Sequence, residues 1–393
     1  MITGIKLHNF KSIYDLPDLK FGEVNFVIGK NGVGKTNLLS AIELTRKLAA
    51  GEDLEVAVSE IAPFSIELFT QDSSSSSTSI ALYLKDRAGK RYEFTYTITL
   101  ASNGLVISDE KLALWENNEF NEVYVRKNDN FAARTENSHK LSEIPLGIKR
   151  GELALANYEN KFASKVASMI SSFKVLWFER SPHPYRVRLH KRDSLDLSNL
   201  DGLVVSLHQN KKEQFNKAVH IIKQIIPEFE EPKVTSIPPP SGSGQQSEDE
   251  SKARERFLVY WGDKDIGDLS YTLSGLSDGN LRIIQLIFAL FDAEGSSCVI
   301  GEEIENGQHY GRIKTLMEVL KHLSVKLNVQ LLFTTHSGEI LTNISASDVI
   351  FCSKDERGHS CYRRLVEVVD IPMVKEELGR EPTAKELIDF GVI

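Results

Sequence analysis

Hydrophobic and polar residues follow two different periods along the chain, which predicts a mixed α/β protein. Apolar runs at 2–10 and 23–28 predict two strands, separated by a polar turn that contains proline. Beyond the second strand, leucine and isoleucine recur at helical spacing over 37–48. A glycine-rich segment, residues 29–36, therefore lies between a strand and a helix.

The next part of the chain changes character. Short, alternating β-branched and aromatic runs predict an antiparallel meander, because turn signals separate them. The serine-rich run 71–79 is interpreted as an exposed loop that joins two of these strands. The predicted strands are 65–69, 79–84, 92–100 and 105–108.

Helical periodicity dominates from about residue 144 to 229, most clearly at 152–173 and 211–226. The Pro-, Gly-, Ser- and acid-rich stretch that follows cannot bury enough apolar surface to order itself, which indicates a mobile surface loop. After it, predicted strands at 299–301, 329–335 and 347–351 alternate with predicted helices at 278–293 and 312–326. This alternation is typical of a parallel sheet flanked by helices.

We therefore expect an α/β fold with a P-loop parallel core sheet, an antiparallel β subdomain and an inserted helical lid. No heptad tract is long enough for a coiled-coil arm. The expected segments are an N-terminal lobe with the glycine-rich segment (1–62), the β subdomain (63–143), the helical insertion (144–230), the mobile loop (231–256), a C-terminal lobe (257–369) and a helical tail (370–393).

Composition narrows the functional classes. Lys and Arg number 47 against 55 Asp and Glu, so the formal charge is −8, which excludes a globally basic nucleic-acid coat. Three cysteines without CxxC spacing argue against a disulfide scaffold or a structural zinc site. The start lacks the pattern of a signal peptide, and no apolar run approaches the ~18 residues of a membrane span. We expect a soluble cytoplasmic protein.

Residues 29–36 read Gly-x-x-x-x-Gly-Lys-Thr, the P-loop pattern. The glycines let successive N–H groups converge on phosphate oxygens, and the following helix adds its positive N-terminal dipole. Lys35 is expected to reach the β- and γ-phosphates of ATP, and the Thr36 hydroxyl to bind Mg²⁺. The expected nucleotide-binding residues here are Gly29, Asn31, Gly32, Gly34, Lys35, Thr36 and Asn37.

Two carboxylates, Glu302 and Glu303, end the apolar strand that begins near Cys298. At a sheet's carboxyl edge, one carboxylate can support a Mg²⁺ shell while the next polarises the attacking water. The alternative is a solvated acidic loop after a strand; the P-loop favours the catalytic interpretation.

Two further segments are candidates for contacts with the γ-phosphate of the nucleotide. Ser277 and Gly279 open an apolar helix, and they form either a second anion-binding terminus or a simple N-cap. His336 follows a buried strand one strand–helix–strand unit after Glu303, which places it on the next strand edge. A histidine at a strand end is otherwise more often structural.

In this order the motifs resemble the ABC-type ATPase head of the SMC/RecF/OLD group. They are most similar to the short stand-alone AAA-type "ATP/GTP phosphatases" of bacterial phage-defence loci. The segment Asn9-Phe-Lys-Ser12 and the Pro-Glu-Phe at 227–229 add to the resemblance, which covers about residues 1–355.

The resemblance implies roles for individual residues. Ser277 and Gly279 would be the signature that reaches the partner's γ-phosphate across a dimer. Glu302 would be the metal-shell acid and Glu303 the general base. Asn306 would lie at the dimer seam, and His336 would be the switch histidine. Two heads would enclose two ATP molecules, and each site would be complete only in trans.

The chain departs from the family pattern at Gly301, Ile304, Gln308 and Tyr310. Because Lys35, both acids and His336 are present, a working but slow hydrolase is expected. Gln71 is one candidate for the glutamine of the Q-loop, although its polar setting favours an ordinary loop residue.

Three functions follow. The first is an ATP-gated homodimeric or higher oligomeric switch that controls a separately encoded effector, such as a nuclease or toxin, in phage defence. The second is a RecF-like DNA-repair clamp with DNA-stimulated hydrolysis. The third, a transporter subunit, is disfavoured by the meander and the helical lid. The basic stretch 185–192 could follow a phosphate backbone, but a solvated loop is the simpler interpretation.

Overall fold

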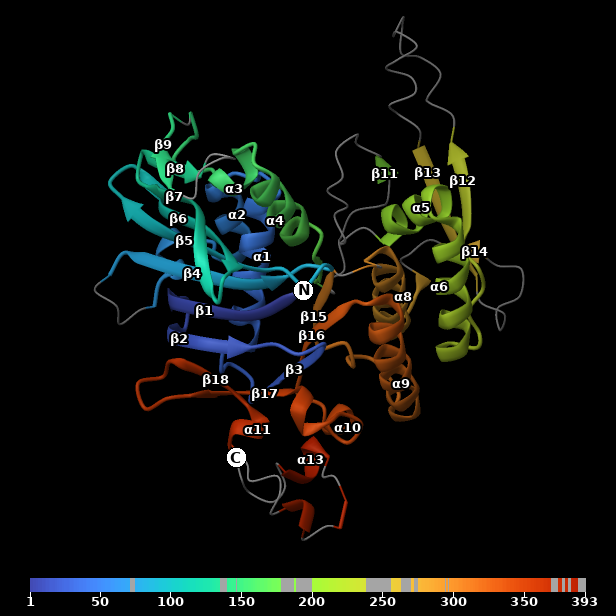
Figure 1. Cartoon of the computed structure of the whole chain (residues 1–393). Helices are drawn as coiled ribbons and strands as arrows, with labels where there is room; N and C mark the ends of the chain where they lie inside the picture. Colours follow the sequence, from blue (N-terminus) through green and yellow to red (C-terminus); the bar gives the residue numbers. More distant parts are fainter. Residues whose placement is uncertain are drawn as a thin grey trace, which may run out of the picture. The chain divides into compact units, whose positions relative to one another are not determined.

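The computed structural model groups the chain into two compact units (Figure 1). The first contains 1–173, 296–300 and 330–393; the second contains 174–295 and 301–329. The sequence suggested six consecutive segments, whereas spatial contacts join its two ends into one unit. The structure describes residues 1–70, 75–134, 140–145, 147–177, 187–188, 200–237, 256–262, 270–271, 275–293, 295, 297–368, 374–376, 379–380 and 383–387.

An eight-stranded antiparallel sheet dominates the first unit, in the order β2-β1-β4-β5-β6-β7-β8-β9. Its inner face is apolar because alternate residues along each strand point into the core, as in the burial pattern of β5. The strands are β1 (Ile2–Phe10), β2 (Ile13–Lys20), β4 (Ser77–Lys85), β5 (Arg91–Ala101), β6 (Gly104–Glu116), β7 (Glu119–Lys127), β8 (Asn130–Arg134) and β9 (Leu141–Glu143).

Strand β2 corrects the expected turn between the first two strands. Its buried residues, Ile13, Leu16 and Leu19, are three apart rather than two, and the pairing with β1 contains a register shift between Leu16 and Leu19. A shift of this kind inserts a residue and removes the simple alternation that marks a strand. Pro17 is tolerated because β2 is an edge strand, where a missing N–H need not cost a ladder hydrogen bond.

Two other local predictions were wrong. Residues expected as a strand at 65–69 form a 3₁₀ helix, η1 (Ser65–Leu68), so the serine-rich run does not join two strands. The single helix expected over 152–173 is two helices, α3 (Ala154–Asn157) and α4 (Lys161–Ser171). Asn160 is the N-cap at which α4 begins, because its side-chain oxygen accepts hydrogen bonds from the backbone N–H groups of Phe162 and Ala163.

The core sheet of the first unit has the order β15-β16-β3-β17-β18. Strands β16 and β17 both run parallel to the central β3, so their carboxyl ends meet at one edge. The strands are β3 (Val24–Ile28), β15 (Cys298–Glu302, of which 301–302 belong to the second unit), β16 (Gln330–Thr335), β17 (Val349–Lys354) and β18 (Ser360–Arg364).

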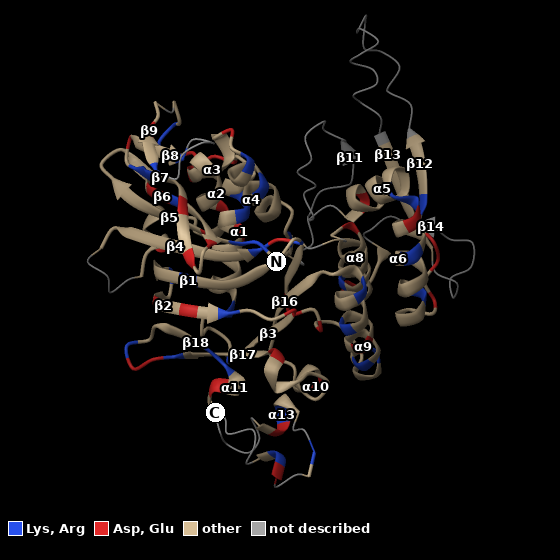
Figure 2. Cartoon of the chain, viewed as in Figure 1, with Lys and Arg blue, Asp and Glu red and all other residues tan. Residues whose placement is uncertain are grey.

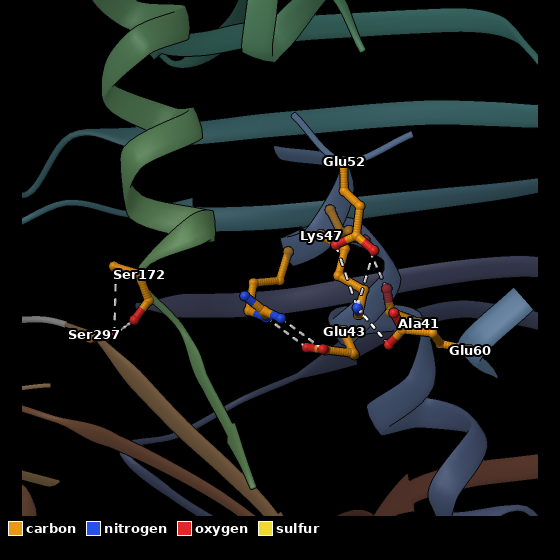
Figure 3. A network of polar contacts seen from close by, with 9 residues as sticks. Ala41, Glu43, Lys47, Glu52, Glu60, Ser172 and Ser297 are labelled. Atoms are coloured by element: carbon orange, nitrogen blue, oxygen red, sulfur yellow. Dashed lines mark hydrogen bonds and ion pairs between the residues drawn. The ribbon is translucent and has the colours of Figure 1, made fainter. Parts of the chain in front are cut away.

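Helix α1 (Lys35–Ala49) follows β3 and is buried on most sides, including at charged positions. Figure 3 shows how those charges are paired. Arg46 donates twice to Glu43, at 2.7 and 2.8 Å, and Lys47 lies 2.6 Å from Glu60 of α2 (Leu54–Ile61). Buried charges are tolerated when paired and hydrogen-bonded, so this network fixes α1 against α2.

The described part of the second unit contains four helices and a small antiparallel sheet. The expected helices at 211–226, 278–293 and 312–326 correspond to α6 (Lys212–Ile225), α8 (Asp278–Asp292) and α9 (Tyr310–Leu327). The other elements are α5 (Leu200–Asn210), β10 (Lys174–Leu176), β11 (Val187–Arg188), β12 (Lys233–Ile237), β13 (Arg256–Gly262) and β14 (Ser270–Tyr271).

A buried carboxylate in this unit predicts a pH-dependent stability. Asp201 of α5 accepts a hydrogen bond from the Trp261 indole at 3.1 Å, and burial raises the pKa of Asp201 from 3.8 to about 6. The folded state therefore binds more protons than the unfolded state between about pH 4 and 6, and stability falls as the pH rises through that range. Asp201→Asn retains an acceptor for Trp261 without the buried charge, so it should raise the free energy of unfolding at pH 7 by about 1–3 kcal/mol.

Denaturant unfolding measured from pH 4 to 8 tests this expectation. The gain should disappear near pH 4, where the wild-type carboxyl is neutral in the folded protein. Trp261→Phe is the opposite control, because it leaves the carboxylate without its donor. An equal gain for Asp201→Asn at every pH would contradict the assignment.

Several short elements complete the first unit: α10 (Gly338–Leu341), η4 (Ala346–Asp348), α11 (Leu365–Val368) and α13 (Ala384–Leu387). Gln71, most of the basic stretch 185–192 and most of the expected mobile loop fall outside the described residues. Among the helices that the structure describes, none combines the length and apolar character needed to cross a membrane.

Candidate functional site

The P-loop connects β3 to α1 within the first unit. Gly34 has φ +109°, a left-handed conformation that strongly favours glycine, and a Cβ atom there would overlap the Ser360 hydroxyl. A Cβ atom on Gly29 would overlap the carbonyl of Cys352. A Cβ atom on Gly32, by contrast, would have no other atom within 4 Å, so the tip of the loop is open for a phosphate.

A hairpin from the far end of the chain holds this loop. The Ser360 hydroxyl donates to the Val33 carbonyl at 2.5 Å, and the Tyr362 hydroxyl donates to the Gly34 carbonyl at 2.6 Å. Burial raises the pKa of Tyr362 well above its usual value, so this phenol stays a donor. Ser12 joins the same network: it lies 2.5 Å from Ser360 and accepts from the Asn37 amide at 2.6 Å.

The sequence did not predict that the β17–β18 hairpin supports the P-loop. Nothing in the sequence near the P-loop indicates it, because the partners are more than 320 residues apart. The motif Asn9-Phe-Lys-Ser12 was recognised only through its family resemblance. The structure supplies the physical reason for its serine, which connects α1 to this hairpin.

Lys35 is the buried cation of the loop, with 7% of its surface exposed. Its ammonium donates to the carbonyls of Gly29 at 2.8 Å and Lys30 at 3.1 Å. No side chain caps α1, and no acidic residue lies in its first turn. The first N–H groups of a helix lack intrahelical partners, so this terminus offers donors and positive potential to an anion.

These features fit a nucleoside triphosphate. Thr36 and Asn31 are exposed beside the buried lysine, so the Thr36 hydroxyl can reach a metal ion bound to the phosphates. The residues from Gly29 to Asn37 therefore stay the predicted nucleotide-binding set of this unit.

His336 lies at the same edge of the core sheet as the P-loop. Thr335, the last residue of β16, pairs with Ile28 in parallel register, and Gly29 follows Ile28. Adjacent strands are about 4.8 Å apart, so the segments that leave β16 and β3 start side by side. The His336 side chain is exposed there.

Ser277 and Gly279 lie at the start of α8 in the second unit. The Ser277 oxygen accepts from the Asn280 N–H at 3.2 Å, so Ser277 is the N-cap, and its exposed hydroxyl still has a proton to donate. Gly279 is buried against Gly307, whose carbonyl a Cβ atom would overlap. Gln308 donates to the Gly279 carbonyl at 2.5 Å. The signature segment is thus packed against the loop that follows the acid pair.

The acid pair occupies the end of β15 and the turn after it. Glu303 has φ +45°, an uncommon backbone conformation for a non-glycine residue and one that can mark functional strain. Its carboxylate accepts from the Asn306 amide at 2.6 Å, and its carbonyl accepts from Arg282 of α8 at 3.3 Å. Asn306 therefore orients the Glu303 carboxylate within the same chain.

Two of the four departures from the family pattern, Ile304 and Gln308, have structural explanations. Ile304, in place of the usual proline, is 1% exposed and anchors the acid turn by burial. Backbone hydrogen bonds from Asn306 to Glu303 and from Gln308 to Glu305, both 3.0 Å, stiffen the same turn. Gln308 contacts the signature, whereas Tyr310 is 68% exposed at the start of α9.

The structure thus assembles the expected residues in two groups. The P-loop residues and His336 lie in the first unit, and the signature, the acids and Asn306 lie in the second.

Comparison with known proteins identifies the family of the chain. A family described as "AAA domain, putative AbiEii toxin, Type IV TA system" matches residues 24–342, about four fifths of the chain. The DNA replication and repair protein RecF of Chloroherpeton thalassium is 32% identical over 89 residues, which are 22% of this chain and 24% of that protein. The alignment therefore spans about a quarter of that relative.

Two solved structures share the fold. The Smc head domain with an extended coiled coil from Pyrococcus furiosus, bound to the C-terminal domain of ScpA, has a TM-score of 0.54 at 13% identity. It covers 96% of this chain and 99% of that one. An SmcHead bound to the C-winged helix domain of ScpA has a TM-score of 0.53 at 14% identity, with coverages of 92% and 96%.

These matches confirm the mixed α/β fold of an ATPase head expected from the sequence. The chain belongs to the family described as "AAA domain, putative AbiEii toxin, Type IV TA system", and its fold is similar to that of SMC head domains.

Proposed function

We propose that this protein is a slow ATPase that works as a switch, pairing head-to-head around ATP and Mg²⁺. The observation that carries the proposal is the P-loop: buried Lys35 lies at an uncapped helix terminus beside an open glycine tip. On binding, the Lys35 ammonium would exchange the carbonyls of Gly29 and Lys30 for phosphate oxygens, which are stronger, charged acceptors.

Hydrolysis needs a base for the attacking water, and we assign that role to Glu303. Asn306 holds its carboxylate in place, which lowers the cost of orienting it. Glu302 and Thr36 would complete the metal shell, and His336 would contact the γ-phosphate. Mg²⁺, when bound, would neutralise charge on the β- and γ-phosphates.

The proposed switch depends on a second copy. A P-loop leaves the far side of the γ-phosphate open, and the Ser277 terminus of a neighbouring molecule would close it and add donors. ATP would then bind the paired state more tightly than separate heads, and hydrolysis would weaken the pair. Gly279 and Gln308 connect this terminus to the acid turn, so closure in trans and base positioning would be linked.

We assign the output of the switch to a separately encoded effector, a nuclease or toxin, in bacterial phage defence. The family description, which names a toxin system, supports a defence setting. The two solved SMC heads are each bound to a domain of another protein, ScpA, which supports a partner-binding head.

A RecF-like clamp is the second candidate. The 32% identity to a DNA replication and repair protein over 89 residues favours it. This candidate requires DNA to stimulate ATP hydrolysis, whereas the effector switch does not.

Completion in trans can be tested by mixing inactive variants. Ser277→Asp retains the N-cap of α8 but places a negative charge against the partner's γ-phosphate, so ATP-dependent pairing and hydrolysis should fall at least tenfold. Ser277→Asn is the matched control, because it caps equally well without charge. A Lys35→Ala chain paired with a Ser277→Asp chain would contain one intact composite site, so mixing should restore part of the activity.

The readouts are steady-state phosphate release and light-scattering mass with and without ATP. If Ser277→Asp hydrolyses ATP like the wild type, or if the mixture stays as inactive as its components, the site is not completed in trans.

A further inference from the structure

The outer face of the eight-stranded sheet contains a hollow that the ATPase proposal does not use. It has a volume of about 540 Å³ and extends over β2, β1, β4 and β5, with Phe120 of β7 at its border. Gly4 forms part of its floor, since a Cβ atom there would approach Tyr83 at 3.5 Å. The volume lies within the range of ligand sites, so a planar group can enter.

Aromatic side chains line one side of the hollow and continue beyond it. The rings of Tyr83 and Phe120 are 5.9 Å apart, and Trp115 contacts Phe120 edge-on at 4.9 Å. All three are only partly buried, although they lie on the face opposite the core. Their arrangement gives a row of rings along the outer surface of the sheet.

Cations cover these rings. The Lys6 ammonium lies 5.1 Å from the centre of Tyr83, and the Arg91 guanidinium lies 5.8 Å from that of Trp115. Such contacts are worth about 0.5–1 kcal/mol at exposed sites. An entering base could therefore replace a cation on a ring face at low cost and leave that cation for a phosphate.

The charge of the hollow is positive. Lys6, Lys20, Lys85 and Arg91 line it against a single carboxylate, Asp18. The nearby Glu93 is 3.2 Å from Lys111, which offsets its charge. The chain as a whole is acidic, with a formal charge of −8, and Figure 2 shows Asp and Glu at many other places in this unit. The excess of cations is therefore a local property of the hollow.

We propose that this face binds single-stranded nucleic acid, with unpaired bases on the rings and phosphates on the cations. The strand order from β2 to β6 spans four spacings of about 4.8 Å, or roughly 19 Å, which suits several nucleotides rather than one. Aromatic platforms with basic borders are typical of single-strand binding, because a duplex already uses its base faces for stacking. An acidic peptide would use the cations but not the rings.

Fluorescence anisotropy with a labelled 15-nucleotide oligothymidine, without ATP, tests the proposal. Lys6→Glu combined with Arg91→Glu should weaken binding at least tenfold and lower the salt dependence, by about 0.7 in the logarithmic slope for each phosphate that the variant no longer neutralises. Lys149→Glu combined with Lys161→Glu is the matched control, since both lysines are exposed outside the hollow. Tyr83→Ala should weaken binding about fivefold or more, and Tyr83→Phe should restore it.

The outcomes separate this proposal from the ATPase switch. Lys35→Ala should bind the oligonucleotide like the wild type. A 15-base-pair duplex should bind more weakly, and a polyglutamate peptide should fail to compete. The proposal is overturned if both charge-reversed pairs bind equally, if Tyr83→Ala has no effect, or if duplex or peptide binds as tightly as the single strand.

Discussion

Lys35→Ala is expected to weaken ATP binding at least a hundredfold and to abolish ATP-dependent pairing. The ammonium is 7% exposed and already positioned by two loop carbonyls, so it supplies its phosphate contacts at little cost in conformational entropy. Two hydrogen bonds to charged oxygens, at about 1.5–3 kcal/mol each, exceed the roughly 2.7 kcal/mol that a hundredfold change in affinity requires. Isothermal titration with ATP and Mg²⁺ measures the effect directly.

Lys30→Ala is the matched control, because it removes the same charge from an exposed position in the same loop. Lys35→Met retains an apolar stem in the buried site and should lose affinity like Lys35→Ala. Unfolding transitions that match the wild type would show that the loop still folds. Tight ATP binding by either Lys35 variant would contradict the assigned nucleotide site.

Glu303→Gln is expected to reduce the turnover number by a factor of about 10² to 10⁴, the contribution of a positioned general base. ATP affinity should change little, because this side chain is assigned to the water and not to the nucleotide. The amide oxygen of glutamine can still accept from Asn306. With hydrolysis blocked, ATP should hold the paired state, and the fraction of paired molecules should rise.

Rapid-quench measurement of phosphate release, together with light-scattering mass in ATP, tests both parts. Glu318→Gln, on the exposed side of α9, removes the same charge and should behave like the wild type. Hydrolysis by Glu303→Gln at the wild-type rate would remove Glu303 as the base.

How far the sequence predicts a feature depends on how far apart its partners lie along the chain. The P-loop glycines, Lys35 and Thr36 are contiguous, so their strand–loop–helix setting could be read directly. Helices α6, α8 and α9 could be predicted equally well, because the periodicity of apolar residues lies within each helix and requires no knowledge of its partners. In β2, however, the buried residues are spaced by three, and the register shift opposite Ile5 to Leu7 accounts for only one of the two intervals, so the strand is concealed.

The candidate site shows the same limit. Glu302, Glu303 and Asn306 were expected to act on nucleotide, but the sequence did not indicate that Asn306 orients Glu303 within its own chain. Gly279 was expected to serve a partner's phosphate. Its lack of a side chain also follows from packing against Gly307, a residue 28 positions later.

The sequence by itself determined the P-loop turn, the acid pair and the mixed α/β class, because each follows from residue type and local spacing. Only the tertiary structure decided that Ser360 and Tyr362 hold the P-loop, that Ile304 anchors the acid turn by burial, and that Lys6, Arg91 and the aromatic rings share one sheet face. The reason is physical. Local preferences select strands, turns and helices, whereas the contacts that support a site come from strand order and register, which depend on the whole chain.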